Sequence, residues 1–351
     1  MFWLVFVASA AVSWGITGIV RRYATAGQVL DHPNARSAHS TPKPRGGGLA
    51  IVVVTSVAVA VLTAIGLVDV PLAAALLGGG ILVAAVGFFD DRRSLPVRLR
   101  ILAHCVAAAG AVYALGGLPP IRVGEVVVQT GAVGYVLATL GIVWSLNLFN
   151  FMDGIDGIAG SEGVFVAAAG SLLALVAGAS AGSVLLGIVF AASCAGFLAW
   201  NWPPAKIFMG DVGSGFVGFV LVMLALADAR GNPVALLVWV ILGGVFFVDA
   251  TVTLARRLLR GQRVHEAHNS HAYQRLARRW KSHRRVTSGV WLLNVLWLLP
   301  CAFVAVRYPS QAARMVVVAL VPLVVLTLLL GAGHSESPTE HGPTSARRRG
   351  S

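Results

Sequence analysis

Long apolar runs separated by short polar segments make up most of this sequence. A hydrocarbon core about 30 Å thick is crossed by about 20 helical residues, because each residue of an α-helix adds about 1.5 Å. Eleven runs have about this length, and each predicts a transmembrane helix. They lie near residues 2–20, 47–67, 71–89, 98–116, 131–150, 161–178, 182–200, 214–229, 233–254, 288–306 and 312–331. The expected fold class is therefore an all-α polytopic membrane protein with about eleven transmembrane helices.

The composition agrees with this expectation. Of the 351 residues, 57% are hydrophobic and only 12% are charged, and the mean hydropathy is +0.80. A soluble domain of this size carries about twice that share of charge. Cys105, Cys194 and Cys301 all fall inside apolar runs without paired spacing, so we expect buried apolar side chains and neither disulfides nor a zinc site.

The basic residues predict the orientation. The first run has no basic segment before it and is followed by Arg21 and Arg22, so we expect a retained helix with its N-terminus outside. Crossing the membrane at every run then places loops 21–46, 90–100, 151–160, 201–213 and 255–287 in the cytoplasm. All but four of the 27 Lys and Arg residues lie in these loops or in the tail, as the positive-inside rule predicts.

The polar segments leave room for one domain. We expect an integral-membrane domain over 1–331 and a disordered cytoplasmic tail over 332–351. The outer segment GGLPPIRVGEVVVQTG, 116–131, alternates weakly and predicts a small hairpin. The net charge of +13 describes one face, which attracts anionic headgroups and phosphorylated ligands. Because no soluble binding module presents this charge, nucleic acid is not an expected partner.

Carboxylates stand where three of the apolar runs meet the cytoplasm. They are Asp90 and Asp91 in GFFDDRRSLPVRLR, Asp153 and Asp156 in NLFNFMDGIDGIAG, and Asp211 in KIFMGDVGSGF. Ionisable groups beside hydrocarbon are costly and usually have partners or a function. For Asp90 and Asp91 the plain alternative is a solvated helix end that is salt-bridged to Arg92 or Arg93.

The second of these segments shows a spacing that favours a metal site. Asn147, Asn150 and Asp153 are three residues apart, so a continuing helix places them along one face. Their oxygens suit Mg²⁺, which needs one or two protein ligands beside substrate phosphates. The neighbouring glycines allow backbone amides to approach a phosphate. The alternative is that the asparagines cap a helix and the glycines form a turn.

A fourth polar loop carries three histidines in VHEAHNSHAYQRLARR. His265, His268 and His271 are again three apart. Zinc binding is one alternative, and a basic amphipathic segment on the membrane surface is another. The many Arg and Lys residues around them favour phosphate groups over zinc.

Together these segments carry a resemblance. DHPNARSAHSTPKPRGGGLAI, GFFDDRRSLP, NLFNFMDGIDGIAG, FMGDVGSGFVGF and HEAHNSHAYQRL, spread over about residues 21–285, resemble the polyprenyl-phosphate N-acetylhexosamine-1-phosphate transferases, glycosyltransferase family 4. The first and last segments resemble most the O-antigen-initiating branch, which uses UDP-N-acetyl-glucosamine, -fucosamine or -quinovosamine. The better-known branches have a His-His doublet where this chain has HNSH.

The resemblance implies a reaction and its partners. A sugar-1-phosphate is transferred from a UDP-N-acetylhexosamine to undecaprenyl phosphate at the bacterial cytoplasmic membrane, UMP is released, and the product begins a polysaccharide of the O-antigen type. It implies an Mg²⁺ cofactor, for which Mn²⁺ can substitute, and it leaves a homodimer open. Two polyanions must meet in this reaction, so a divalent cation and basic groups have to offset their repulsion.

The resemblance also implies residue roles. Metal binding falls to Asn150, Asp153 and Asp211, and catalysis to Asp90, Asp91 and Asp156. Substrate binding falls to Asn147, His265, His268, His271, Arg275, Arg36, His39, Lys43 and Arg45. For Asp249 we expect a structural role in its helix.

Two other classes of protein compete with this interpretation. A secondary transporter also carries intramembrane carboxylates, but it binds near the bilayer midplane through repeated, broken helices. A CDP-alcohol phosphotransferase also has an Asp-Gly signature, but that signature continues with Ala-Arg, whereas Asp156-Gly157 continues with Ile158-Ala159.

Overall fold

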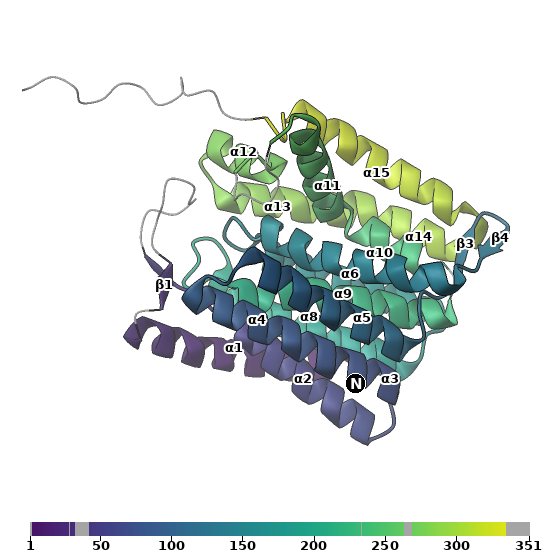
Figure 1. Ribbon diagram of the computed structural model, residues 1–351, viewed down its shortest axis with the longest axis horizontal. Helices are drawn as coiled ribbons and strands as arrows, with labels where there is room; N and C mark the ends of the chain where they lie inside the picture. Colours follow the sequence, from purple (N-terminus) through teal and green to yellow (C-terminus); the bar gives the residue numbers. More distant parts are fainter. Residues whose placement is uncertain (1, 28, 32–41, 233, 263–268, 335–351) are drawn as a thin grey trace, which may run out of the picture.

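The computed structural model describes residues 2–27, 29–31, 42–232, 234–262 and 269–334 as a bundle of long helices that run roughly side by side (Figure 1). The helices of the first half are α1 (Phe2–Ala26), α2 (Leu49–Ala64), α3 (Val70–Ala74), the π-helix η1 (Ala75–Gly79), α4 (Gly80–Arg93), α5 (Val97–Leu115), α6 (Gly131–Met152) and α7 (Ile158–Val176). Those of the second half are α8 (Ala181–Asn201), α9 (Asp211–Gly231), α10 (Ala235–Leu242), α11 (Gly244–Leu259), α12 (Ala272–Trp280), α13 (His283–Leu293), the π-helix η2 (Asn294–Leu298), α14 (Leu299–Arg307), the 3-10 helix η3 (Pro309–Gln311) and α15 (Ala312–Leu329).

The protein is an all-helical polytopic membrane protein. In the part of the chain that the structure describes, 9 helical segments are long and apolar enough to cross a membrane. α10 and α11 together form a tenth candidate, which is bent by 74° at Gly243. The remaining predicted run, near 47–67, forms α2, which has 16 residues and is shorter than the usual span. The count of eleven and the N-terminus outside stay predictions.

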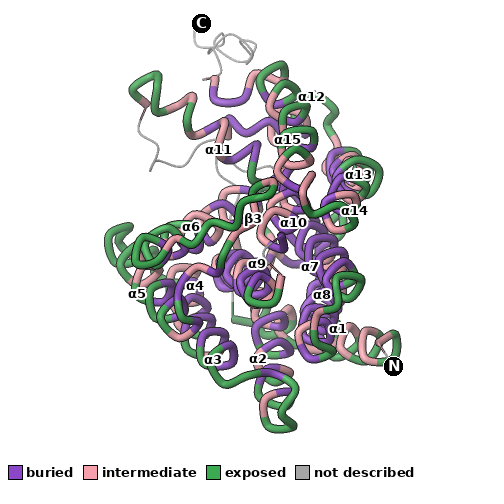
Figure 2. Tube along the Cα trace, turned by 90° about the vertical axis from the view of Figure 1, so that its right-hand side faces the viewer, coloured by how far each residue is buried: buried purple, intermediate pink, exposed green. Residues whose placement is uncertain are grey.

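α9 lies at the centre of the bundle, and most of its side chains are buried (Figure 2). Its glycines explain the close packing, because helix backbones approach each other where side chains are small. A Cβ on Gly218 would lie 2.5 Å from the carbonyl oxygen of Ser145 in α6. A Cβ on Gly87 in α4 would clash with the carbonyl oxygen of Asp211. The first residue of α9 is therefore held directly against α4.

Two short hairpins mark opposite ends of the bundle (Figure 1). β1 (Leu30–Asp31) pairs with β2 (Lys43–Pro44), and β3 (Ile121–Val123) pairs with β4 (Val126–Val128). The second hairpin confirms the one that the sequence predicts within 116–131. The first hairpin is joined to the segment before α9, because the Phe208 N–H donates to the Pro44 carbonyl at 2.8 Å.

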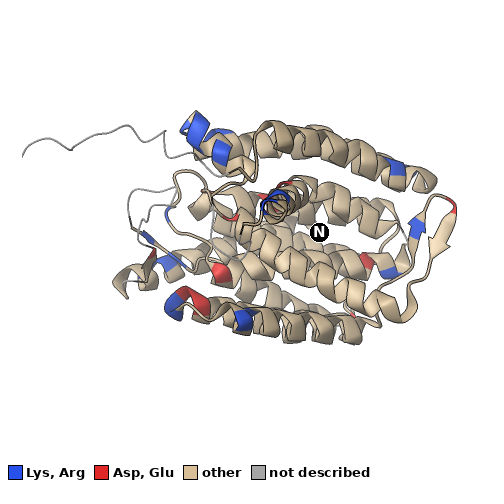
Figure 3. Ribbon diagram, turned by 45° about the horizontal axis from the view of Figure 1, so that its top comes forward, with Lys and Arg blue, Asp and Glu red and all other residues tan. Residues whose placement is uncertain are grey.

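Most charged residues lie near the ends of the long helices (Figure 3). At one end, the first three residues of the expected tail are held against α11. The Arg256 guanidinium donates to the carbonyl of Ala332 at 2.8 Å, and the Gly333 N–H donates to the carbonyl of Ser270 at 2.9 Å. The rest of the expected tail, 335–351, lies outside the described residues.

Candidate active site

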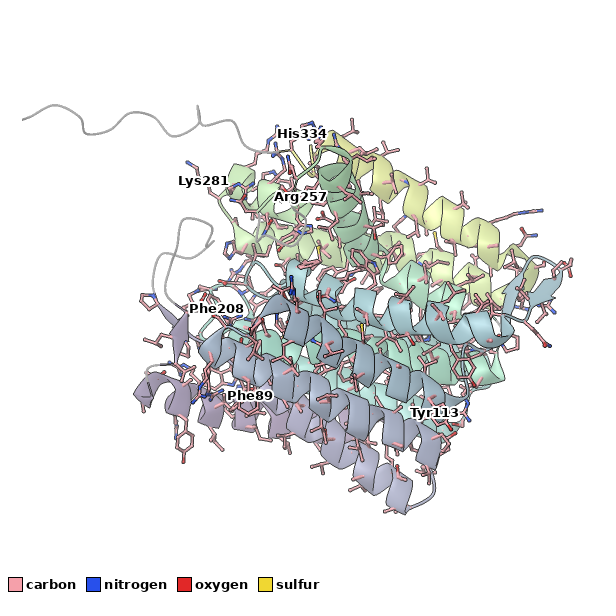
Figure 4. All side chains as sticks on the ribbon, in the orientation of Figure 1. Phe89, Tyr113, Phe208, Arg257, Lys281 and His334 are labelled. Carbon is pink, nitrogen blue, oxygen red and sulfur yellow. The ribbon has the colours of Figure 1, made fainter. Side chains whose placement is uncertain are left out.

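Two cavities share a wall at the end of the bundle that carries β1. Asn150 and Asp211 line both of them. The larger has a volume of about 280 Å³ and is also lined by Asp31, Arg45, Asp153, Gly154, Ile155, Asp156, Asn201, Phe208, Gly210, Ser214, Gln274 and His283. The smaller has a volume of about 120 Å³ and is also lined by Val86, Gly87, Asp90, Val97, Arg100, Ile101, His104, Leu146, Asn147, Phe151 and Gly215. Figure 4 shows Phe208 at the end of the bundle opposite Tyr113.

The three residues spaced three apart in α6 connect these cavities. Asn147 lines the smaller cavity, Asn150 lines both, and Asp153, just after the end of α6, lines the larger one. The predicted helix face is therefore the ridge along which the two cavities meet. The Asn150 amide donates to the Ser214 hydroxyl at 3.3 Å, which orients that side chain across to α9.

Asp211, the first residue of α9, lies between two guanidinium groups. Arg45 Nη2 donates to Asp211 Oδ1 at 2.7 Å, and Arg100 Nη1 lies 3.6 Å from Asp211 Oδ2. Gly210, just before it, has φ = +77°, a backbone conformation that glycine adopts without strain. This turn places the Asp211 carboxylate on the wall between the cavities.

Asp90 lies in the last turn of α4 and lines the smaller cavity. Its Oδ1 accepts a hydrogen bond from the Leu95 N–H at 2.6 Å, and its Oδ2 forms an ion pair with Arg100 of α5. The expected partners Arg92 and Arg93 are thus replaced by Arg100. Arg92 instead lies 3.5 Å above the ring of Phe88.

The side chain of the adjacent Asp91 is almost fully buried. Asp91 is not among the described residues that line either cavity. Its carboxylate accepts hydrogen bonds from the N–H groups of Asp211 at 2.9 Å and Val212 at 3.2 Å. Arg45 Nε forms an ion pair with Asp91 Oδ1 at 2.8 Å. These contacts cap the N-terminus of α9, a position that favours a carboxylate.

Asp156 lies directly before α7 and is held by backbone and side-chain donors. Its Oδ2 accepts from the Ala205 N–H at 2.9 Å and lies 3.5 Å from Lys43 Nζ. The Gly157 N–H, next along the chain, donates to Asn201 Oδ1 at 3.0 Å. The loop between α6 and α7 is thereby fixed to the loop between α8 and α9.

The larger cavity concentrates negative charge around Arg45. Desolvation raises the pKa of Asp153 well above its usual range, and the nearby charges of Asp211, Asp91 and Asp156 raise it further, whereas Arg45 opposes the rise. For Arg45 itself, burial favours a lower pKa, but the charges of Asp211 and Asp91 outweigh it and the pKa is raised. A concentration of carboxylates facing one guanidinium can accommodate additional positive charge.

The donor set fits a hard divalent metal ion. In the described parts of the chain no three His, Cys, Asp or Glu side chains converge as a metal site. The larger cavity is lined by four aspartates, Asp31, Asp153, Asp156 and Asp211, and by the Asn150 amide; the predicted metal ligands among them are Asp153, Asp211 and Asn150. Mg²⁺ is commonly bound by one or two carboxylates together with waters and substrate phosphates, so this sparse oxygen set suits it.

Three sequence-predicted substrate residues, Lys43, His271 and Arg275, are not among the described residues that line either cavity, although Lys43 Nζ lies 3.5 Å from Asp156 Oδ2. His271 is 1% exposed, and its Nδ1 lies 3.3 Å from Asp249 Oδ1. Arg275 Nε donates to the carbonyl of Leu330 at 2.9 Å. Asp249 also accepts from the Ala272 N–H at 2.9 Å, so it caps α12 as a structural residue. The predicted residues Arg36, His39, His265 and His268 lie outside the described residues.

The structure also adds residues that the sequence did not single out. Arg100 and His104 reach the smaller cavity from α5. Asn201, Phe208, Gln274 and His283 line the larger cavity. Of these, Arg100, Phe208 and Gln274 lie within quoted motifs, GFFDDRRSLPVRLR, KIFMGDVGSGF and VHEAHNSHAYQRLARR, but their residue types were not assigned a role there. His104 follows Arg100 by one helical turn, which was the available signal in α5.

Comparison with known proteins gives a consistent result. The model of the family described as "Glycosyl transferase family 4" matches residues 73–228. The chain is 30% identical over 302 residues to the "Probable undecaprenyl-phosphate N-acetylglucosaminyl 1-phosphate transferase" of Bacillus subtilis, an alignment that covers 83% of this chain and 82% of that protein.

Two further relatives extend the similarity. The "Decaprenyl-phosphate N-acetylglucosaminephosphotransferase" of Mycolicibacterium smegmatis is 31% identical, over 93% of this chain and 87% of its own length. The "Phospho-N-acetylmuramoyl-pentapeptide-transferase" of Heliobacterium modesticaldum is 31% identical, over 75% of this chain and 85% of its own length. The family match over residues 73–228 includes Asn150 and Asp211, which form the shared wall of the cavities.

Proposed function

Because the chain belongs to glycosyl transferase family 4, we propose that it transfers N-acetylglucosamine-1-phosphate from UDP-N-acetylglucosamine to undecaprenyl phosphate. It is a multi-pass bacterial membrane protein and a polyprenyl-phosphate N-acetylhexosamine phosphotransferase. The observation that carries the proposal is the pair of cavities that meet at Asn150 and Asp211. A two-substrate transfer needs two compartments and one shared reaction centre.

The larger cavity suits the UDP-sugar. It contains Arg45, with Lys43 close by at Asp156, and these cations offset the charge of a diphosphate. Phe208 is the phenyl side chain among its described lining residues. Lys43 Nζ lies 5.2 Å from the centre of this ring, so a base that stacks on Phe208 would also lie beside a cation. The predicted contributions of Arg36, His39, His265, His268, His271 and Arg275 to donor binding remain part of the proposal.

The smaller cavity suits the phosphate end of the lipid. Arg100 provides a cation there, while Val86, Ile101 and Leu146 provide apolar walls for the first part of a polyprenyl chain. Asp90, ion-paired with Arg100, is placed to orient the acceptor phosphate or to take its proton. Asn147 lies on the same wall and can donate through its amide.

The reaction forms one phosphorus–oxygen bond and breaks another. An oxygen of the acceptor phosphate attacks the β-phosphorus of the donor in line, and the bond from that phosphorus to the bridging oxygen breaks. The bridging oxygen leaves with UMP, and the lipid carries a pyrophosphate-linked sugar. We favour direct attack over an aspartyl intermediate, because the acceptor is already an oxyanion. An exchange of labelled UMP into UDP-sugar without acceptor would contradict direct attack.

Enzymes of this family generally depend on a metal ion. We propose that Asn150, Asp153 and Asp211 hold Mg²⁺, or Mn²⁺ in its place, since both ions accept hard oxygen ligands. When bound, the ion would neutralise part of the negative charge that the two substrates bring together. Asp156 and Asp91 then keep the surrounding loops and the start of α9 in place.

We also propose a finer role: the reaction is the first step in the synthesis of a cell-surface polysaccharide of the O-antigen type. It rests on the first polar loop, ARSAHSTPKPRGGG, and on the His-x-x-His-x-x-His spacing. A strain that lacks the gene should lose this polysaccharide while keeping its peptidoglycan, and loss of peptidoglycan alone would contradict the role. Family membership argues against the transporter and CDP-alcohol alternatives.

The sugar can be tested on membranes that contain the protein. They are incubated with undecaprenyl phosphate, Mg²⁺ and, separately, the UDP-N-acetyl derivatives of glucosamine, fucosamine and quinovosamine, and the lipid product is identified by mass. We expect the glucosamine derivative to give the product at the highest rate. A product from one of the other sugars alone would contradict the choice of sugar and leave the reaction class intact.

A further inference from the structure

His283 is a histidine of the larger cavity that neither the motifs nor the proposed reaction uses. It is the first residue of α13, it lines the cavity beside Asp156, and its side chain is 19% exposed. Its position differs from that of His271, which is buried against Asp249 and is not among the described residues that line the cavity. Of the described histidines, His283 is therefore the one that the larger cavity presents to a ligand.

One nitrogen of the His283 ring is already engaged. The backbone N–H of Asp156 donates to Nδ1 at 3.3 Å, whereas Oδ2 of the same aspartate lies farther from Nδ1, at 3.5 Å. One turn along α13, the Thr287 hydroxyl donates to the Asp156 carbonyl at 3.0 Å. The start of α13 is therefore held to the loop before α7 by two contacts to one residue. A neutral imidazole that accepts at Nδ1 carries its proton on Nε2.

The helix start keeps this ring in a fixed place. The Ser282 hydroxyl accepts from the Arg285 N–H at 3.3 Å and so caps α13. Arg284 Nη2 donates to the carbonyl of Pro203 at 2.9 Å, in the loop that also supplies Ala205 to Asp156. A side chain that is fixed before the ligand arrives loses little entropy on binding.

The cavity walls indicate which part of the donor His283 meets. Asn150 and Asp211 belong to both cavities, so the phosphorus under attack must lie near them. His283, Asn201 and Phe208 line the larger cavity only. These three residues therefore line the part of the larger cavity beyond the shared wall. In an in-line reaction the leaving UMP lies opposite the acceptor phosphate, so the nucleotide half of the donor has to extend into this part.

We propose that His283 Nε2–H donates a hydrogen bond to an acceptor oxygen in the UMP half of the UDP-sugar. This inference rests on the proposed function, because it takes the ligand of the larger cavity to be a nucleoside diphosphate sugar. UMP is a product of the same reaction and contains the same half. His283 is thus a binding residue of the donor and also contacts the leaving group.

Two amide variants separate the two ring nitrogens. In His283→Asn the side-chain amide falls near the position of Nδ1, so the contact with the Asp156 N–H can persist while the donor at Nε2 is lost. In His283→Gln the amide falls near the position of Nε2, so the donor persists while the contact with Asp156 is lost. Thr287→Val is the matched control, because it removes a contact to the Asp156 carbonyl and leaves His283 in place.

The readouts are the affinity for UMP by calorimetry with Mg²⁺, the KM for each substrate and the Tm. We expect His283→Asn to weaken UMP binding and to raise the KM for UDP-N-acetylglucosamine by about 10- to 100-fold, the effect of one hydrogen bond to a charged group. His283→Gln and Thr287→Val should stay within about threefold. The KM for undecaprenyl phosphate should not change in any variant.

Several results would overturn the inference. Equal UMP affinity of His283→Asn and the wild type would show that Nε2 binds nothing in that half. A loss in His283→Gln that equals the loss in His283→Asn, or unfolding of both, would assign the ring to structure alone. A wild type that binds UMP but never releases it from a UDP-sugar would contradict the proposed reaction instead, and the two failures are therefore distinguishable.

Discussion

The carboxylate of Asp91 accepts a hydrogen bond from the backbone N–H of Asp211 at 2.9 Å, so the end of α4 is joined to the start of α9. The same carboxylate binds Arg45, which in turn contacts the Asp211 side chain. The neighbouring Asp90 faces the smaller cavity and pairs with Arg100. Two adjacent aspartates therefore have different surroundings, one at a helix cap and one at the acceptor cavity.

This difference predicts different failures on mutation. Asp91→Ala leaves buried N–H groups and Arg45 without their acceptor, so we expect a loss of about 1–3 kcal/mol in unfolding free energy and a lower Tm in detergent. Asp90→Asn should keep a Tm close to that of the wild type and lose turnover by about 10²- to 10⁴-fold with UMP binding intact. An Asp91→Ala protein with an unchanged Tm and no turnover would instead make Asp91 part of the chemistry.

The shared wall predicts a change in metal requirement. If Asn150 and Asp211 supply oxygens to Mg²⁺, then Asn150→Ala and Asp211→Asn should need more Mg²⁺ for half-maximal activity, or should lose turnover. The measurement is the rate of UMP release across a range of Mg²⁺ concentrations. Asn147→Ala is the comparison variant: Asn147 lines only the smaller cavity, so its loss should alter use of the acceptor and leave the Mg²⁺ requirement unchanged. An Asp211→Asn enzyme with normal activity and an unchanged Mg²⁺ optimum would contradict the metal assignment.

The contact of α4 with α9 predicts sensitivity to a single methyl group. In Gly87→Ala the new Cβ would clash with the backbone of Asp211, so α4 or the start of α9 must shift and the wall between the cavities is displaced. We expect at least a tenfold loss of kcat/KM. The control is Gly78→Ala in η1, the π-helix that precedes α4. Among the described residues, no atom outside its own helix lies within 4 Å of the new Cβ, so this variant should behave like the wild type. Similar activities of the two variants would show that this contact does not position the site.

The long apolar runs allowed most of the helical fold to be predicted, and the spacing of Asn147, Asn150 and Asp153 predicted a shared face that the structure uses as the ridge between the cavities. The break at Gly243 was not predicted, because apolar residues continue on both sides of it, although the Gly243-Gly244 pair was an available signal. Arg100 was not predicted either. Its pairing with Asp90 depends on a chain reversal after Ser94, whose φ of 43° no propensity rule would assign to a serine.

The orientation in the membrane follows from the positive-inside rule and can be tested by labelling. In a background without the three native cysteines, Glu125→Cys lies in the turn of the β3–β4 hairpin and Arg279→Cys lies on the exposed face of α12. We expect an impermeant thiol reagent added to whole cells to label the first and to leave the second unlabelled until the membrane is opened. The reverse pattern would place the candidate active site outside.

The identity of the released nucleotide tests the central claim most directly. Purified protein is incubated with UDP-N-acetylglucosamine, undecaprenyl phosphate and Mg²⁺, and the nucleotide product is separated and identified. Attack on the β-phosphorus breaks the pyrophosphate bond, so the account predicts UMP in an amount equal to the pyrophosphate-linked lipid, and excess UMP should convert that lipid back to UDP-sugar. Release of UDP would mean that the sugar alone was transferred and would contradict the account.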